Sequence, residues 1–320
     1  MTQKLNLNSR AQAICQQVID QSRALDVEEI KLTNGAKVLD FGSDRFGSEA
    51  GGIMLSKICL ADLADVKSVT ADEDSISTSM IRVETDHPIE ACIASQYAGW
   101  PFSTESFFSM CSGPARLKRG REEILTRFGL TSDEELAVAV FESNQLPVES
   151  DIADFAEECG CREDQVTICV ARTKSLPGTM QVLARSVETA MHKLFELDFD
   201  LTRVKRGIGY APIPPPAEDD YRAMGWTNDA ILYGGDVHLW IDRADGLNEL
   251  IERLPSSSSH EFGRPFIEIF EEYDRDFYKV DRMLFSPAKI TVTSLDTGDS
   301  MAAGAVRNDL LKASFEATSA

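Results

Sequence analysis

The feature that most constrains the fold of this chain is a strand, a glycine-ended loop and a helix, repeated along the sequence. The pattern is clear over residues 36–58 and 166–192, and its outline recurs over 288–303. The stretches ASQYAGW (94–100) and AILYGGD (230–236) also look alike, each at a similar distance after one of the first two copies. Alternating strands and helices indicate α/β architecture. We therefore predict a mixed α+β protein with two related α/β halves and the active cleft between them.

Chain length fits this division, because 320 residues are enough for two domains. We predict a first α/β domain over 1–160 and a second over 161–320. Whether the C-terminal strand (288–293) and helix (302–311) pack on the first domain is left open.

Local patterns predict several further elements. Thr33–Gly35 is typical of a turn between two short strands, and the apolar run Ala91–Ala94 favours a strand. The prolines of RGIGYAPIPPP (206–216) predict a stiff loop or extended rim. Residues 228–242 are predicted as two short strands on either side of Tyr233–Gly235.

The stretch Pro177–Leu197 is predicted as one amphipathic helix. Its apolar positions recur at helical spacing, at Leu183, Val187, Met191 and Leu194. The opposite face carries Arg185, Glu188 and His192. A guanidinium one turn from a carboxylate can hold that carboxylate ionised and aimed. The alternative is a solvated helix face, on which such a pair contributes only about 0.3–0.5 kcal/mol.

The net charge of −21 argues against nucleic acid or an anionic membrane as a partner. A local basic cluster stands out from this background, at Arg116, Lys118, Arg119 and Arg121. It is either a charged helix end or a dock for an anionic tail. No apolar run approaches the roughly 18–20 residues that span a bilayer, and the N-terminus carries no signal-peptide pattern. We expect a cytoplasmic protein.

The seven cysteines are odd in number and spread through apolar stretches, which favours buried free thiols over a disulfide framework. The four histidines show no paired spacing for a metal. We predict no metal site.

Seven stretches, taken in order, resemble the methenyltetrahydromethanopterin cyclohydrolase family. They run from near residue 47 to near residue 298: GSEAGGIMLSKICL, ASQYAGW, SGPAR, TKSLPGTMQVLARSVETAMHKL, GYAPIPP, NDAILYGG and DFYKVDRMLFSPAKITV. The resemblance implies an enzyme of one-carbon metabolism that adds water to the methenyl bridge of a tetrahydromethanopterin carrier and opens it reversibly to the N5-formyl compound. It also implies a homotrimer of two-domain subunits that uses no metal and no redox cofactor.

The resemblance assigns roles to particular residues. The methenyl carbon is already electrophilic because two nitrogens share its positive charge, so the enzyme needs a positioned water and a base. Glu188 is the candidate base, and Arg185 would orient it and keep it ionised. His192 and Lys193 are given at most a supporting role, the alternative being a solvated helix end.

The same resemblance predicts the binding residues. Around the pterin ring we place Gln96, Tyr97, Tyr233, Gly234 and Gly235. For the polar tail of the carrier we place Ser112, Gly113 and Arg116.

Two other classes of protein remain as alternatives. A metal-dependent amidohydrolase would contain stoichiometric zinc or iron and lose activity with a chelator. A non-catalytic protein that binds the tetrahydropterin carrier would have no turnover to lose when Glu188 is replaced.

Overall fold

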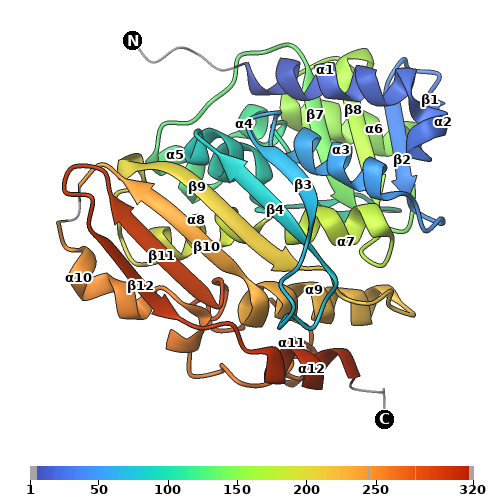
Figure 1. The fold of residues 1–320 in the computed structure, drawn as a ribbon. Helices are drawn as coiled ribbons and strands as arrows, with labels where there is room; N and C mark the ends of the chain where they lie inside the picture. Colours follow the sequence, from blue (N-terminus) through green and yellow to red (C-terminus); the bar gives the residue numbers. More distant parts are fainter. Residues whose placement is uncertain (1–5, 244, 278, 317–320) are drawn as a thin grey trace. The chain divides into compact units, whose positions relative to one another are not determined.

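The computed structural model describes residues 6–243, 245–277 and 279–316, which fold into two compact units (Figure 1). The first unit comprises the chain up to Ala64 together with Glu90–Gln181, and the second comprises Asp65–Ile89 together with the chain from Val182 onward. The chain therefore passes between the units three times, and the C-terminal strands and helix belong to the second unit. The division into folding domains at residue 160 stays a prediction.

The first unit is built on a six-stranded sheet in the order β1-β2-β8-β7-β6-β5. Its strands are β1 (Glu28–Lys31), β2 (Lys37–Gly42), β5 (Trp100–Ser103), β6 (Phe108–Ser112), β7 (Ala137–Glu142) and β8 (Val166–Ala171). The three central strands β2, β8 and β7 are parallel, and the outer pairs are antiparallel. All of β8 is buried, as expected for a parallel strand that is covered on both faces.

Helices cover both faces of this sheet, and two hydrophobic clusters show which helices pack on each face. On one face α6 (Glu149–Cys159) brings Phe155 against Val38 and Ile168. On the other face α1 (Leu7–Asp20) and α3 (Glu49–Cys59) pack against the alternate residues of the same strands, such as Leu39 and Cys169. The layers are therefore helix, sheet and helix, and the predicted mixed α/β class is confirmed.

The first two copies of the strand–loop–helix pattern form as predicted, but they lie in the same unit. They are β2 followed by α3 and β8 followed by α7 (Leu176–Leu183), and their strands are parallel neighbours. The third copy is wrong, because it forms a hairpin of β11 (Lys289–Ser294) and β12 (Ser300–Gly304). Gly298 adopts a φ of 77° there and donates to the carbonyl of Ser294, which closes the turn.

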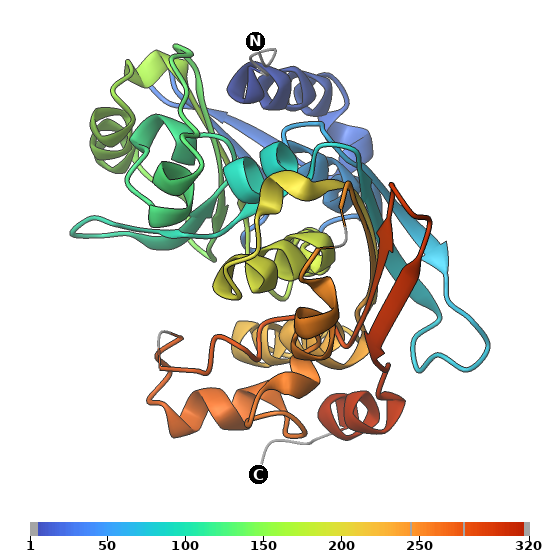
Figure 2. The same ribbon diagram turned by 90° about the vertical axis from the view of Figure 1, so that its left-hand side faces the viewer.

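The second unit is built on another six-stranded sheet, in the order β12-β11-β10-β9-β4-β3. The strands not yet given are β3 (Asp65–Thr70), β4 (Ser79–Thr85), β9 (Val204–Pro212) and β10 (Asp236–Ile241). The helices α8 (Ser186–Glu196) and α9 (Asp220–Gly234) lie against one face (Figure 2). Strands β10 and β11 accordingly alternate between buried and half-buried residues.

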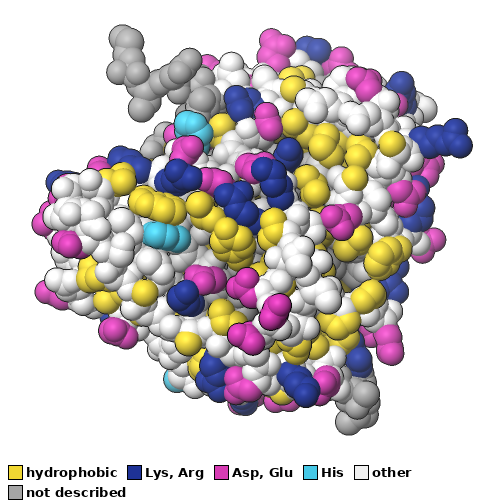
Figure 3. All heavy atoms as spheres, in the orientation of Figure 1, with side chains coloured by type: hydrophobic (Ala, Val, Ile, Leu, Met, Phe, Trp, Pro, Cys, Tyr) yellow, Lys and Arg dark blue, Asp and Glu magenta, His cyan; other side chains and the backbone are white. Residues whose placement is uncertain are grey.

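The other face of this sheet carries intermixed charges. Arg82 and Arg206 both pair with Glu84, and Lys289 pairs with Asp236 at 2.8 Å. Figure 3 shows this face, with Lys and Arg side chains close to Asp and Glu. Although the chain has a net negative charge, positive and negative side chains are mixed on this face.

Three element predictions are wrong in whole or in part. Residues 206–212 form β9, because the first proline of the run is Pro212 and the earlier residues keep their amide donors. Residues 228–233 belong to α9 rather than to a strand. Ile89–Gln96 is a π-helix, whereas a strand was predicted at Ala91–Ala94. A short apolar run such as this does not distinguish a buried strand from a buried helical segment.

The terminal helix α12 (Asn308–Glu316) also begins later than expected, because residues 302–304 belong to β12. The remaining short elements are α2 (Ser22–Leu25), α4 (Arg116–Arg119), α5 (Glu123–Arg127), α10 (Leu247–Leu250), α11 (Phe266–Glu272), η2 (Glu163–Gln165), η3 (Leu201–Arg203), η4 (Ile251–Arg253) and η5 (Ser256–Ser258). Among the described residues, no helix combines the length and apolar character needed to cross a membrane.

Candidate active site

The stretch predicted as one helix over 177–197 is two helices, α7 and α8, separated by a turn at Ala184–Arg185. The chain passes from the first unit to the second between Gln181 and Val182, three residues before Arg185. The boundary between the units therefore lies in the last turn of α7, and α8 lies wholly in the second unit. No proline or glycine marks the turn, so the sequence gives no signal for it.

The turn places the candidate catalytic residues at the start of α8. Arg185 is the N-cap residue, and its carbonyl accepts a hydrogen bond from the amide of Thr189 at 2.8 Å. Glu188 lies in the first helical turn and is only 6% exposed. The positive end of the helix dipole favours a negative charge at that position. A solvated helix face is therefore the wrong description for Glu188.

The far end of α8 is held by a buried lysine. Lys193 is fully buried, and its ammonium donates to the hydroxyl of Ser258 at 2.9 Å and to the carbonyl of Met283. Burial lowers its pKa from the ordinary 10.5 to about 8. The alternative of a solvated helix end is wrong for Lys193, which fixes α8 to the C-terminal part of the second unit.

His192 is also mostly buried, and desolvation lowers its pKa to about 4. Its Nε2 atom lies 3.4 Å from a carboxylate oxygen of Glu196, one turn further along α8. At neutral pH this imidazole is uncharged.

In the first unit the structure places Tyr97, predicted at the pterin ring, beside Arg116, predicted at the polar tail. This guanidinium is fully buried and pairs with the carboxylate of Glu122, with Nε donating to Oε1 at 2.9 Å. Its Nη1 donates to the carbonyls of Ile93 and Ser95 at the end of the π-helix, at 3.1 and 3.3 Å. The guanidinium carbon also lies 5.0 Å from the ring centroid of Tyr97.

The other predicted residues of the first unit are Gln96, Ser112 and Gly113. Gln96 and Ser112 are buried, and the amide of Gly113 donates to the carbonyl of Ser95 at 2.8 Å. The hydroxyl of Ser112 donates to the carbonyl of Val140 at 3.4 Å. The hydrogen bond of Gly113 ties the π-helix to the turn before α4, and that of Ser112 joins β6 to β7. Sequence reasoning missed Glu122, which neutralises the buried cation.

Tyr233, Gly234 and Gly235 lie at the end of α9. Tyr233 is fully buried in a hydrophobic cluster with Phe266 and Leu311, a cluster that includes no residue of α8. Its hydroxyl donates to the carbonyl of Arg264. The role of these three residues at the pterin ring stays a prediction, while Tyr233 has an evident part in the core.

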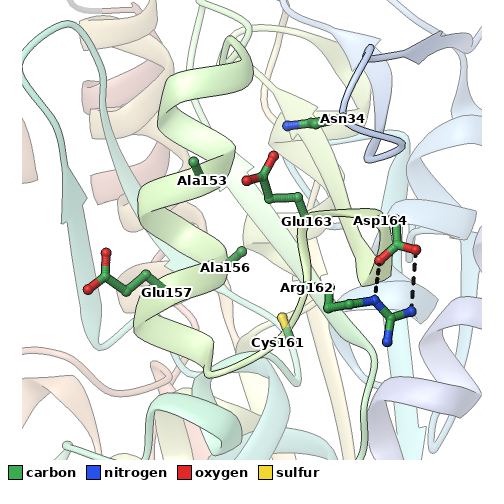
Figure 4. A pocket seen from close by; sticks show the side chains of 8 residues that line it. All are labelled: Asn34, Ala153, Ala156, Glu157, Cys161, Arg162, Glu163 and Asp164. Atoms are coloured by element: carbon green, nitrogen blue, oxygen red, sulfur yellow. Dashed lines mark hydrogen bonds and ion pairs between the residues drawn. The ribbon is translucent and has the colours of Figure 1, made fainter.

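A separate hollow of about 700 Å³ lies in the first unit beside α6 (Figure 4). Its lining includes Asn34, Glu157 and Cys161, and none of the predicted site residues. Within the described ranges, no three His, Cys, Asp or Glu side chains are grouped to hold a metal ion.

Comparison with known proteins defines the class of the chain. Residues 6–315 match the family described as Cyclohydrolase (MCH), and the chain belongs to that family. Proteins named methenyltetrahydromethanopterin cyclohydrolase are similar over nearly its whole length. The Rhodopirellula baltica protein is 44% identical over 91% of this chain and 90% of its own length. The Methanosarcina barkeri protein is 39% identical over 97% of this chain and 98% of its own length. The family resemblance inferred from the motifs is thereby confirmed.

Proposed function

We propose that this chain is a cyclohydrolase that hydrates 5,10-methenyl-tetrahydromethanopterin and opens it reversibly to N5-formyl-tetrahydromethanopterin. The observation that carries the proposal is the family match over residues 6–315. Relatives with this activity in their names cover at least nine tenths of the chain. Those names favour neither a metal-dependent amidohydrolase nor a non-catalytic carrier-binding protein.

The position of Glu188 supports its role as general base. Water attacks the cationic methenyl carbon, a C–O bond forms, and the carboxylate accepts one proton of that water. The same carboxyl group then donates this proton to N10 as the C–N10 bond breaks. The hydroxyl proton of the intermediate leaves as the formyl carbonyl forms, so each turnover releases one proton. Arg185, three residues before Glu188, favours the ionised base at the start of each cycle.

The structure supports different roles for the proposed binding residues. The ring of Tyr97 packs against the guanidinium of Arg116, and Tyr97 directly follows a π-helix. π-helical turns are frequent at functional sites. This supports Tyr97 and the adjacent Gln96 as contacts of the pterin ring. Arg116 is already paired with Glu122, so its proposed contribution is to position Tyr97 and the Ser112–Gly113 turn for the substrate.

Three further properties are proposed from the family: a homotrimeric assembly, a cytoplasmic location, and catalysis without a metal or redox cofactor. Size-exclusion chromatography with light scattering tests the first. Turnover after exhaustive chelation and metal analysis tests the last.

The decisive experiment is a spectrophotometric assay of the purified protein with methenyl-tetrahydromethanopterin, beside the methenyl-tetrahydrofolate analogue. We expect loss of the amidinium absorbance with the methanopterin substrate, undiminished by chelator. Binding without turnover would refute the proposal in favour of a carrier-binding protein. Turnover that requires added zinc or iron would favour the amidohydrolase.

A further inference from the structure

Two glycines of the RGIGY stretch, Gly207 and Gly209, lie on the face of β9 that α8 covers. Both are buried, and neither has a positive φ. Alanine would therefore keep an ordinary backbone conformation at either position. The reason for glycine here must be the space above the strand.

A side chain of α8 already fills that space. A Cβ atom on Gly207 would lie 2.6 Å from Cγ1 of Val187, and one on Gly209 would lie 3.0 Å from Cγ2 of the same residue. The second Cβ would also lie 2.3 Å from the hydroxyl oxygen of Ser186. The isopropyl group of Val187 thus occupies a notch that the two glycines leave in the strand.

The strand that carries the notch is held from both sides. Gly207 is in register with Leu239 of β10 and with Thr85 of β4. A crowded contact between β9 and α8 is therefore relieved by movement of the helix. Ser186 and Val187 are the two residues directly before Glu188, in the same helical turn.

We propose that Gly207 and Gly209 are positioning residues for catalysis. The depth at which Val187 enters their notch sets where the first turn of α8 lies, and so where the carboxylate of Glu188 meets the attacking water. This inference rests on the proposed cyclohydrolase function and specifies what holds its base in place.

Gly207→Ala tests the notch directly. Valine in a helix is restricted to about one χ1 rotamer, so Val187 cannot turn away from the new methyl group. Bringing the contact from 2.6 Å to the 3.4 Å of an ordinary one moves the first turn by about 0.8 Å. A misplacement of about 1 Å can cost about 100-fold in rate. We expect kcat to fall about 10- to 100-fold while KM changes less than about threefold.

A second substitution separates positioning from general damage to the fold. Val187→Ala in the Gly207→Ala background removes the obstructing methyl groups and should restore at least half of the lost activation free energy. Gly225→Ala is the matched control, because the nearest atoms to its Cβ would all belong to Ile267 of α11, with Cβ of Ile267 at 3.1 Å. Its kcat should stay within about twofold of the wild type.

The outcomes are distinguishable. A folded Gly207→Ala protein with wild-type kcat, or a loss that Val187→Ala does not relieve, overturns the inference. If circular dichroism shows Gly207→Ala to be unfolded, Gly209→Ala paired with Ser186→Ala gives the same comparison at the second glycine, where the nearest obstructing atom is the rotatable hydroxyl of Ser186. A wild-type protein without turnover refutes the proposed function, and this inference falls with it.

Discussion

Replacing Lys193 by methionine would measure the cost of the charge buried under the helix that carries Glu188. The ammonium is fully buried and has hydrogen bonds to Ser258 and to the carbonyl of Met283. Desolvation is the main cause of its lowered pKa; Arg253 lowers it further, and Asp281 opposes the shift. Methionine has a similar length and no charge, so it removes the ammonium while keeping most of the packing.

The magnitude follows from two opposing effects. A pKa lowered from 10.5 to about 8 corresponds to about 3 kcal/mol against the charged form at pH 7. Methionine removes this cost but leaves the Met283 carbonyl without its ammonium donor, which costs about 1–3 kcal/mol. The hydroxyl of Ser258 still has the carbonyls of Arg253 and Pro255 as acceptors. We therefore expect the free energy of unfolding at pH 7 to change by less than about 2 kcal/mol.

The pH dependence gives the sharper test. Between pH 8 and 10.5 the unfolded chain keeps a proton that the folded protein has released. Because the unfolded state then binds more protons, stability rises with pH over this window. Wild-type protein should gain about 3 kcal/mol relative to Lys193→Met between these limits.

Urea unfolding followed by circular dichroism at several pH values would measure that gain. Lys312→Met, at an exposed position of α12, is the control, and its pH dependence should follow the wild type. Parallel curves for wild type and Lys193→Met would refute the reasoning.

Three other substitutions test the candidate site. Glu188→Gln should lower kcat by about 100-fold or more, the usual effect of a lost general base, while a binding titration still shows the methenyl substrate bound; undiminished turnover would contradict the assignment. Arg185→Ala should move the acidic limb of the pH–kcat profile to higher pH, because the carboxylate loses a cationic neighbour, and an unchanged limb would count against that role. Glu122→Ala should lower the free energy of unfolding by about 3–5 kcal/mol, since it leaves the buried Arg116 without its carboxylate. A loss below about 1 kcal/mol in urea unfolding would show that the pair is not the buried one described.

The parts of the fold that the sequence predicted well are those with strong local signals. Strands β7 and β8 are continuous apolar runs, and Thr33–Gly35 forms the expected turn between β1 and β2. The break between α7 and α8 could not be predicted in this way. Leu183 and Val187 keep helical spacing across it, and both belong to the second unit, because the chain leaves the first unit at Gln181. Periodicity shows which face of a segment is apolar, but it does not show where one helix ends and the next begins.

The roles of long polar side chains were the hardest to predict, because burial depends on partners far away in the sequence. Lys193 stands where a solvated helix end was a reasonable alternative, yet its hydrogen bonds reach Ser258 and Met283. Arg116 belongs to a basic cluster that could have met an anionic tail, yet Glu122 and two backbone carbonyls surround it. A charge count along the chain cannot separate these cases from exposed ones.

Glu188 is proposed as the base from a motif, but most of the residues that hold its helix lie outside that stretch. The first turn of α8 rests on Gly207 and Gly209, and its far end is fixed by Lys193 to Ser258 and Met283. These supports come from segments up to about 90 residues away in the chain. In the proposed mechanism one carboxylate serves as both base and acid and must stay correctly placed through two proton transfers, so rigid support of α8 would matter as much as the identity of residue 188. Substitutions at these supports should therefore lower kcat even though none of them changes a group that meets the substrate.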